Sequence, residues 1–344
     1  MNTNRKKILV VRNDKLGDFM LAWPALAVLK QSLPNSEIHV LVNPYTADIA
    51  RLCPNIDQVI LDPGPNGGIA SQQAFAKQLK QQKYDAAVTL FSTTRIGWLL
   101  LLAGIPYRLA PATKFAQLFY HRRLKQHRSR SEKPEYLYNQ DLIVRYLHDA
   151  GIRNVAQPAP PYLQFDNAET EQLRAGFCKA HQIPTGQRLV FIHPGSGGSA
   201  NNLSLEQYAE LGRHLTSNMG HHIVVSAGPD ELDQATAVAK RLGSAAHSIY
   251  HSTAGLERFA RHIACADLFI SGSTGPLHIA GALNCNTAAF YPRRRSATAL
   301  RWQTTNSTEK RVAFSPPENS GEEEMGGINV DEAAAQISQQ FLLR

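Results

Sequence analysis

Short apolar runs alternate with helical stretches along both halves of the chain. The runs are continuous, as in ILVV and VILD, and do not alternate with polar residues. Such runs are typical of strands buried on both faces of a parallel sheet, in which helices make the crossovers. We expect strands over 7–12, 37–43, 57–61 and 84–90 in the first half, and over 188–193, 222–226, 267–271 and 286–291 in the second.

The segments between these runs have the apolar spacing of amphipathic helices. Ser204 and Gln207 form a capping-box pattern at the start of one helix, and Asn329 is placed to cap a last helix that runs to Leu343. The expected helices before it cover 19–31, 47–53, 69–82, 95–103, 134–150, 205–219, 231–242, 256–265 and 276–283.

A proline-rich segment, Gln157–Pro161, interrupts this alternation. Its prolines cannot continue a helix or a central strand, so an extended linker is expected there. At 344 residues the chain is also too long for one ordinary core. The pattern predicts an α/β protein with two Rossmann-like parallel-sheet lobes and a central cleft. The predicted division is 1–160 and 161–327, followed by a C-terminal helix at 328–344.

Composition is that of a globular protein, with 43% hydrophobic and 19% charged residues. The longest uncharged apolar stretch, Ile96–Tyr107, is shorter than the ~20 residues of a membrane-spanning helix. At the N-terminus only four apolar residues precede the next charge, which argues against an ordinary signal peptide. The four cysteines show no close-pair spacing, so we expect no disulfide framework, no zinc knuckle and a cytoplasmic location.

The chain carries a formal net charge of +8, which favours anionic partners such as nucleotide phosphates, nucleic acid or an acidic membrane surface. The excess of positive charge is local, because the segment Lys114–Lys133 contains seven Lys and Arg residues and a single glutamate. Few aromatic residues interleave with this run and no nucleic-acid-binding motif is present. A basic nucleic-acid-binding protein is therefore kept only as the non-enzyme alternative.

One candidate loop, Val11–Asp18, directly follows the first expected strand. Ligands of open α/β sheets bind at the carboxyl ends of the strands. Gly17 permits a tight turn, and Asp18 is then either a functional carboxylate or the N-cap of the next helix. Asp14 is interpreted as a turn former. No GxGxxG motif is present, which argues against a nicotinamide cofactor.

Three further loops in the second half also lead from a strand toward a helix. His193–Ser199 is rich in Gly and Ser, so its backbone N–H groups could cradle a phosphate. In Ser271–His278, Thr274 can cap a helix while hydroxyl groups face an anion. The carboxylates of Ala227–Glu231 suit a ribose. Plain connections, a packing histidine and an N-cap are the alternatives for these loops.

The order of the motifs VRNDKLGD, WPAL, HPGSGGS, GPDE and STGPLHIAGAL resembles glycosyltransferase family 9, the heptosyltransferases that build the lipopolysaccharide inner core. The resemblance implies a GT-B fold and an inverting transfer with no metal and no cofactor. It implies that the C-terminal lobe holds a nucleotide-sugar donor such as ADP-heptose, and that the N-terminal lobe faces the acceptor, a lipopolysaccharide inner core or related lipid-linked glycan.

The resemblance also assigns roles to residues. It makes Asp18 the catalytic base, places Glu231 near the donor's ribose and places Leu256 near the base of the nucleotide. The residues that it assigns to the diphosphate turns are Ser196, Gly197, Gly198, Ser199, Ser273, Thr274, Gly275 and His278.

Two departures from the family pattern affect the donor site. Asn201 stands where many members have a lysine, and Ser273 stands where heptosyltransferases often have an aspartate that binds the donor sugar. Arg293, with its neighbours Arg294 and Arg295, is the candidate to replace the missing positive charge; a solvated basic turn is the alternative.

A peripheral contact with the anionic inner face of a bacterial membrane is also expected. The uncharged stretch Ile96–Tyr107 would provide apolar contact, and a core helix followed by an exposed loop is the alternative. Transfer from another nucleotide sugar and a GT-B nucleotide-sugar epimerase are the remaining enzyme alternatives. The basic residues assigned to the acceptor and membrane side are Arg122, Arg123, Arg128 and Arg130.

Overall fold

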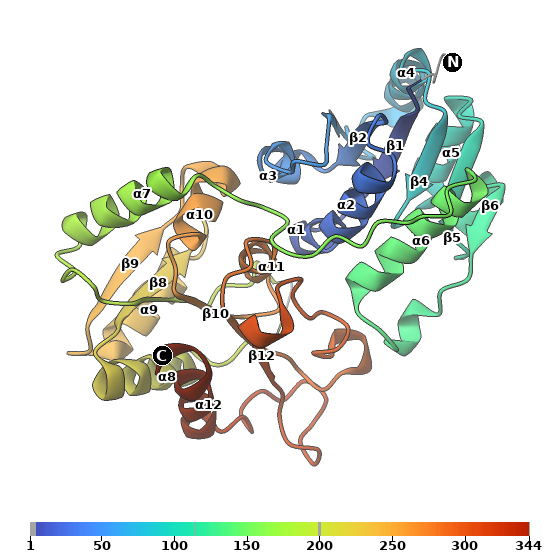
Figure 1. Cartoon of the computed structure of the whole chain (residues 1–344). Helices are drawn as coiled ribbons and strands as arrows, with labels where there is room; N and C mark the ends of the chain where they lie inside the picture. Colours follow the sequence, from blue (N-terminus) through green and yellow to red (C-terminus); the bar gives the residue numbers. More distant parts are fainter. Residues whose placement is uncertain (1–4, 114, 199–200, 344) are drawn as a thin grey trace. The chain divides into compact units, whose positions relative to one another are not determined.

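The computed structural model describes residues 5–113, 115–198 and 201–343 (Figure 1). The chain divides into two compact units. The N-terminal unit comprises Met1–Arg128 and Lys133–Tyr162, and the C-terminal unit comprises Ser129–Glu132 and Leu163–Arg344. Each unit is built on a six-stranded parallel sheet, which confirms the predicted α/β class with two Rossmann-like sheets.

The N-terminal sheet has the strand order β3-β2-β1-β4-β5-β6. Strands β2 and β3 are added on one side of β1, and β4 to β6 are added on the other side. The loops after β1 and β4 therefore flank the switch point of the strand order, where open α/β sheets bind ligands. The strands are β1 (Lys7–Val11), β2 (Glu37–Val42), β3 (Gln58–Leu61), β4 (Ala86–Thr89), β5 (Tyr107–Pro111) and β6 (Arg122–Leu124).

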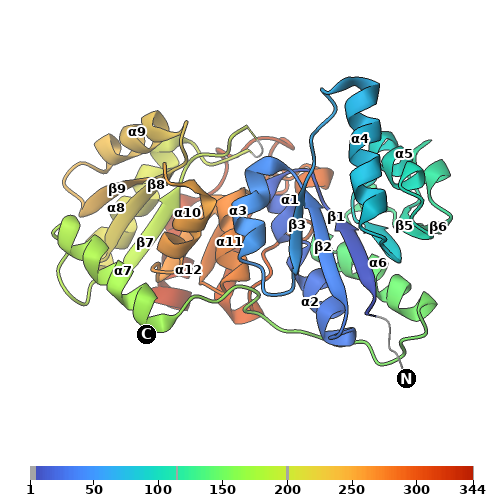
Figure 2. The ribbon, with the colours of Figure 1, turned by 90° about the horizontal axis from the view of Figure 1, so that it is seen from above.

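Helices cover both faces of this sheet (Figure 2). Helices α4 (Gly68–Gln81) and α5 (Thr94–Leu102) bury one apolar cluster against it, while α2 (Trp23–Ser32) packs on α6 (Glu135–Asp149). The short elements are α1 (Leu16–Met20), α3 (Ala47–Arg51) and the 3-10 turns η1 (Pro44–Thr46), η2 (Phe115–Phe119) and η3 (Arg128–Arg130).

The single helix expected over 19–31 is in fact two helices, α1 and α2. Pro24 lies in the first turn of α2 and has no backbone N–H, so it cannot continue the hydrogen-bond ladder from α1. The break leaves α1 as a separate short helix that begins at Leu16, two residues before Asp18. The expected single helix was therefore wrong, and the correction separates the Asp18 turn from the core helix.

The C-terminal sheet repeats this topology in the order β12-β11-β10-β7-β8-β9, with its switch point between β7 and β10. The strands are β7 (Leu189–His193), β8 (His222–Ala227), β9 (His247–His251), β10 (Leu268–Gly272), β11 (Thr287–Phe290) and β12 (Arg311–Phe314). The helices are α7 (Asn167–Ala180), α8 (Leu205–Met219), α9 (Leu232–Leu242), α10 (Gly255–Ile263), α11 (Gly275–Ala282) and α12 (Val330–Ile337), with 3-10 turns η4 (Arg295–Ala297) and η5 (Thr308–Lys310).

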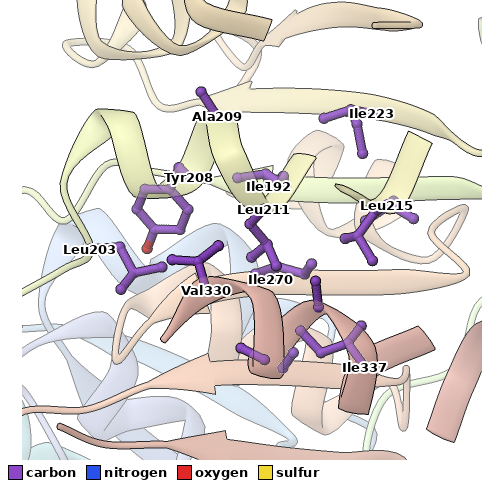
Figure 3. Packing of buried hydrophobic residues seen from close by; sticks show 14 of the residues in the cluster. Ile192, Leu203, Tyr208, Ala209, Leu211, Leu215, Ile223, Ile270, Val330 and Ile337 are labelled. Carbon is purple, nitrogen blue, oxygen red and sulfur yellow. The ribbon is translucent and has the colours of Figure 1, made fainter. Parts of the chain in front are cut away.

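The core of the C-terminal unit lies where α8 and α12 pack against the sheet (Figure 3). Leu211 and Leu215 of α8 meet Val330 and Ile337 of α12, and all four side chains are buried. The capping box at Ser204 forms with both of its hydrogen bonds, and Asn329 caps α12, as predicted. The last helix is α-helical only to Ile337 and continues as a π-helical turn, Ser338–Leu342.

None of the helices among the described residues combines the length and the apolar content needed to cross a bilayer.

Candidate functional site

Asp18 lies in the first turn of α1, directly beyond the carboxyl end of β1. The N-cap of α1 is Lys15, and its side chain makes no capping hydrogen bond. The alternative that Asp18 is an N-cap is therefore wrong. The Asp18 carboxylate instead accepts a short hydrogen bond from Nη2 of Arg12.

Arg12 is the centre of a charged cluster that the sequence analysis did not identify. Its guanidinium is 2% exposed, and its Nε donates to Oδ1 of Asp14 at 2.9 Å. Its Nη1 donates to Oε1 of Glu135 at 3.0 Å, and Glu135 also accepts from Nη1 of Arg128 at 2.7 Å. We call these five residues, Arg12, Asp14, Asp18, Arg128 and Glu135, the Arg12 cluster.

Asn139 of α6 anchors the cluster to the backbone around α1. Its Oδ1 accepts from Nη1 of Arg12 at 3.0 Å, and its Nδ2 donates to the carbonyl of Leu21 at 3.0 Å. Because α6 also supplies Glu135, one helix binds Nη1 of the guanidinium, whereas Asp18 binds Nη2. The position of the Asp18 side chain therefore depends on residues more than a hundred positions away in the sequence.

Burial and charge perturb the titration of this cluster. Burial raises the pKa of Asp14 to about 6; Arg12 opposes the shift and the neighbouring Asp18 charge adds to it. For Arg12 burial disfavours the charged form, but the surrounding carboxylates outweigh burial and raise its pKa. Arg12 is therefore a permanent cation, whereas Asp14 can change its charge in the neutral to mildly acidic range.

A second polar group lines the same edge of the N-terminal sheet. Asp62, which follows β3, accepts short hydrogen bonds from Asn13 and from Arg95 near the start of α5. Arg95 also donates from Nη1 to Oε1 of Gln72 at 3.0 Å. The carboxyl edge of this sheet thus offers fixed donors and acceptors, which suit a ligand rich in hydroxyl groups.

In the C-terminal unit the carboxylate of Glu231 occupies the loop that was predicted to cradle phosphate. Its Oε1 accepts from the backbone N–H of Gly197 at 3.0 Å, and its Oε2 accepts from the N–H of Gly228 at 2.9 Å. A Cβ atom at Gly195 would lie 2.2 Å from Cδ of Glu231, so only glycine leaves room for this carboxylate. A carboxylate of the chain itself thus binds a backbone N–H group of this loop.

The buried His193 at the end of β7 lies beneath this carboxylate. Its Nε2 is 3.4 Å from Oε2 of Glu231, and its Nδ1 is 3.1 Å from the carbonyl oxygen of Ser226. Burial lowers the pKa of His193, against the attraction of Glu231. We infer that His193 supports the loop mainly as a packed, hydrogen-bonded ring.

The turn after β10 is capped as predicted. Oγ1 of Thr274 accepts from the N–H of Leu277, and it lies 3.0 Å from Oγ of Ser271. Ser273 is half-buried beside it. One turn into α11, His278 is buried, and burial lowers its pKa to about 4, so the ring is neutral at pH 7. Among the described residues no group hydrogen-bonds to Nδ1 of His278, although this atom is buried.

Asn202 joins the two turns that flank the switch point, a role that the sequence analysis missed. Its Nδ2 donates to the carbonyl of Pro194 at 2.8 Å and to that of Gly195 at 3.2 Å. A Cβ atom at Gly272 would lie 1.7 Å from Oδ1 of Asn202, so the amide fills the space over the end of β10. One side chain thus binds the turn after β7 and lies against the end of β10.

The arginines proposed to replace the missing lysine have separate partners. Nη1 of Arg293 donates to the carbonyl of Pro317 at 2.9 Å. Arg294 pairs at 2.8 Å with Glu323, and Asn201 donates to the same carboxylate. Arg294 is therefore the arginine that shares a partner with Asn201. Of the other assigned residues, Leu256 is half-buried in the first turn of α10. Ser196 is half-buried, Gly197 and Gly198 are exposed, and Ser199 lies outside the described residues.

The arginines assigned within the basic segment Lys114–Lys133 differ in their exposure. Arg122 and Arg123 are exposed on the edge strand β6, and Arg130 is exposed on η3, but Arg128 is bound to the buried Glu135. Arg128 therefore belongs to the Arg12 cluster and is less exposed than the other three arginines assigned to the acceptor and membrane side. Lys114, at the start of the run, lies outside the described residues.

A cavity of about 650 Å3 lies between α8 and the segment before α12, next to Asn201 and Asn202. It is lined by four carboxylates, those of Glu206, Glu210, Glu323 and Asp331. One ligand atom each from Glu210, His214 and Asp331 lies within 4.8 Å of the others, and Nε2 of His214 is 2.5 Å from Oδ1 of Asp331. The acidic lining does not suit a diphosphate.

Comparisons with known proteins identify the family of the chain. The family model for glycosyltransferase family 9 (heptosyltransferase) matches residues 72–315. A protein of Haemophilus influenzae, named as a presumed glycosyltransferase, is 44% identical and aligns over 97% of this chain and 96% of its own length.

Two solved structures share the fold. A family 9 glycosyl transferase from Veillonella parvula superposes with a TM-score of 0.82 at 16% identity, covering 100% of this chain and 99% of its own. The ADP-heptose lipopolysaccharide heptosyltransferase II of Escherichia coli superposes with a TM-score of 0.79 at 17% identity, covering 98% and 99%. These matches confirm the expected GT-B fold. The chain belongs to glycosyltransferase family 9, and it is a glycosyltransferase.

Proposed function

We propose that the protein transfers a heptose, with inversion, from ADP-heptose or a related nucleotide sugar to a lipopolysaccharide inner-core or similar lipid-linked glycan. The observation that carries this proposal is the placement of Asp18. Its carboxylate is not used to cap a helix but is held at the carboxyl edge of the N-terminal sheet by the buried Arg12.

In the proposed reaction Asp18 removes the proton from an acceptor hydroxyl. The acceptor oxygen attacks the anomeric carbon of the donor, and the bond from that carbon to the diphosphate oxygen breaks. The electron pair of that bond leaves with the nucleoside diphosphate. A general base of this kind typically contributes about 10²–10⁴-fold to the rate.

The leaving diphosphate would be held by the turns after β7 and β10. The N–H groups of the Gly197–Gly198 turn, the hydroxyl groups of Ser196 and Ser273 and the N-terminus of α11 at Gly275 provide partial positive charge. His278, neutral at pH 7, would contribute a hydrogen bond rather than charge. Donors fixed in this way stabilise the charge that develops on the leaving group, so we propose no metal.

Glu231 must change partners when the donor binds. Its carboxylate accepts from Gly197, whose N–H the diphosphate would need. We propose that the phosphate displaces the carboxylate, which then accepts from a ribose hydroxyl, while Leu256 packs near the base.

The lipid-linked acceptor is proposed to bring the protein to the inner face of the membrane. Phe115 and Leu118 of η2 are 78% and 72% exposed, and η2 packs beside α5, whose Leu101 and Leu102 are also exposed. Large exposed apolar side chains near basic ones are typical of surfaces that bind an anionic bilayer. Arg122 and Arg123 on β6 would provide the positive charge in the N-terminal unit. Arg130, which is also exposed, belongs to the C-terminal unit and is proposed to add a positive charge there.

Mass spectrometry of the products from a panel of nucleotide sugars tests the proposal. The purified protein is incubated with ADP-heptose, ADP-, GDP- or UDP-hexoses and a heptose-deficient lipopolysaccharide acceptor, with Asp18→Asn as the control. We expect the mass of one heptose to be added from ADP-heptose only with the wild-type protein. Transfer of a different sugar would refute the heptose assignment. Donor isomerised without acceptor would indicate an epimerase, and binding of duplex DNA alone would indicate a nucleic-acid-binding protein.

A further inference from the structure

The Arg12 cluster contains more negative than positive groups. Three carboxylates, those of Asp14, Asp18 and Glu135, face the two guanidinium groups of Arg12 and Arg128. When all three carboxylates are ionised, the five residues carry one more negative than positive charge. Arg12 and Glu135 are at most 2% exposed, so water screens this imbalance poorly.

The donors of Arg12 are divided so that Asp14 and Asp18 compete for one cation. Nε serves Asp14, Nη2 serves Asp18, and Nη1 is shared by Glu135 and Asn139. The Asp14 and Asp18 side chains are each 16% exposed, whereas Glu135 is 1% exposed and is also bound by Arg128. The proton that relieves the excess charge therefore resides most readily on Asp14, the carboxyl group whose pKa is raised by burial.

We propose that Asp14 is a positioning residue that acts on Asp18 through Arg12, and that its own gain or loss of a proton sets how strongly Asp18 attracts the acceptor's proton. This inference rests on the proposed role of Asp18 as the base. When Asp14 is ionised it takes part of the stabilisation that Arg12 offers, so the Asp18 anion is less stabilised and is a stronger base. When Asp14 is neutral, Arg12 stabilises Asp18 alone and weakens it as a base.

The charged groups near Asp14 support this positioning role. Arg12, just after β1, and Asp18 on α1 are the charged groups that act on Asp14 directly. Glu135 on α6 and Arg128 on η3 join the cluster through the guanidinium of Arg12, whose central carbon lies 5.9 Å from the uncharged Phe91 ring. Burial raises the pKa of Asp14 to about 6, which places its titration inside the range in which an enzyme can be assayed. Asp14 is thus a titrating group and not only a turn former.

Nuclear magnetic resonance of the full chain, labelled with 13C at the aspartate side-chain carboxyls, tests the coupling without any substrate. Wild type should show one aspartate with a midpoint near pH 6, and this signal should be absent from Asp14→Asn. Asp18→Asn should lower the midpoint of Asp14 by about half a pH unit or more, because a like charge is removed. Asp48→Asn, at an exposed aspartate, is the matched control and should leave it unchanged. An Asp14 midpoint at or below about pH 4.5, or one that does not respond to Asp18→Asn, would overturn the proposal.

The pH profile of sugar transfer tests the consequence for the reaction. We expect Asp14→Asn to lower kcat about fivefold or more at pH 7.5, to approach wild type near pH 5, and to leave the donor KM within about twofold. Asp14→Glu should restore part of the loss at pH 7.5. A loss of kcat that is equal at all pH values would indicate a merely structural role and refute the proposal. If wild type transfers no sugar at all, the proposed function fails, and the resonance data alone decide whether Asp14 and Asp18 are coupled.

Discussion

Replacing Arg12 by methionine should strongly destabilise the N-terminal unit. The change keeps much of the side-chain length but removes a buried cation that binds three carboxylates and the amide of Asn139. Removing one member of a buried ion pair typically costs about 3–5 kcal/mol, because the partner is left buried without compensation. Glu135 keeps Arg128 as a partner, so we expect about 4 kcal/mol and not a multiple of the single-pair value.

Urea unfolding followed by tryptophan fluorescence can assign this loss to the correct unit. Trp23 and Trp98 lie in the N-terminal unit and Trp302 lies in the C-terminal unit. A Trp302→Phe background therefore reports the N-terminal unit alone. In that background Arg51→Met, which removes an exposed arginine paired with Asp48, is the matched control and should change the free energy of unfolding by less than about 1 kcal/mol. A loss of less than about 1 kcal/mol in Arg12→Met would refute the view that this guanidinium holds the cluster together.

The same assay should show a pH dependence that originates at Asp14. Its pKa is raised from 3.8 to about 6 in the folded chain, so the folded state favours the protonated form. The stability that this proton provides is complete below about pH 4 and is lost as pH rises through 6, with a total of about 3 kcal/mol. Asp14→Asn should therefore gain stability relative to wild type between pH 4.5 and pH 7.5. A constant difference between the two proteins over this range would contradict the shift.

Three other changes test the remaining parts of the site. Asp18→Asn should lower kcat about a hundredfold or more with donor binding nearly unchanged, and transfer within a few-fold of wild type would show that another group is the base. Glu231→Ala should bind inorganic pyrophosphate about tenfold more tightly and ADP-ribose no more tightly than wild type, as measured by calorimetry; weaker pyrophosphate binding would show that Glu231 does not compete for the loop. Neutralising Arg122 and Arg123 should weaken binding to phosphatidylserine vesicles by ~1 kcal/mol each and Phe115→Ser should add to the loss, whereas unchanged sedimentation would indicate an ordinary solvated surface.

The strands that the sequence predicted are mainly those buried in the middle of each sheet. The missed strands β6, β9 and β12 are edge strands, and none of them has a residue that is fully buried. An edge strand is covered on fewer sides, so its sequence need not be a continuous apolar run. β5 was missed for another reason, because it follows the apolar helix α5 closely and merges with it in the pattern.

Helix α7 was not predicted, although its sequence contains a pattern that marks the start of a helix. Only Phe177 is buried in its 14 residues, so apolar periodicity is almost absent. Asp166, however, is followed three residues later by Glu169, and its side chain accepts from the Glu169 N–H. This spacing of a capping residue and an acidic residue is a helix-start pattern that does not depend on burial.

The positions of functional side chains were harder to predict from the sequence than the fold, because they depend on contacts between distant segments. Asp18 was identified by its place after a strand, but Glu135 reaches the same guanidinium from 123 positions away. One local signal did exist, since Arg12 directly follows a run of buried strand residues. A charge in such a position requires partners of opposite charge, and the nearby Asp14 and Asp18 are the local signal of a buried, paired Arg12.

The two sheets share one feature at the same topological position, a buried side chain that contacts carboxylates from nearby loops. The first strand of each sheet lies beside the switch point and leads into a buried nitrogen-bearing side chain, Arg12 just after β1 and His193 at the end of β7. Each of these side chains lies beneath carboxylates from the loops around it: Asp14 and Asp18 in one unit, Glu231 in the other. The difference lies in charge. Arg12 remains a cation and fixes its carboxylates firmly, which suits a base that must stay in place. Burial lowers the pKa of His193, so Glu231 is held mainly by two backbone N–H groups and can yield them to a phosphate. One topology thus provides a fixed carboxylate in one unit and an exchangeable carboxylate in the other.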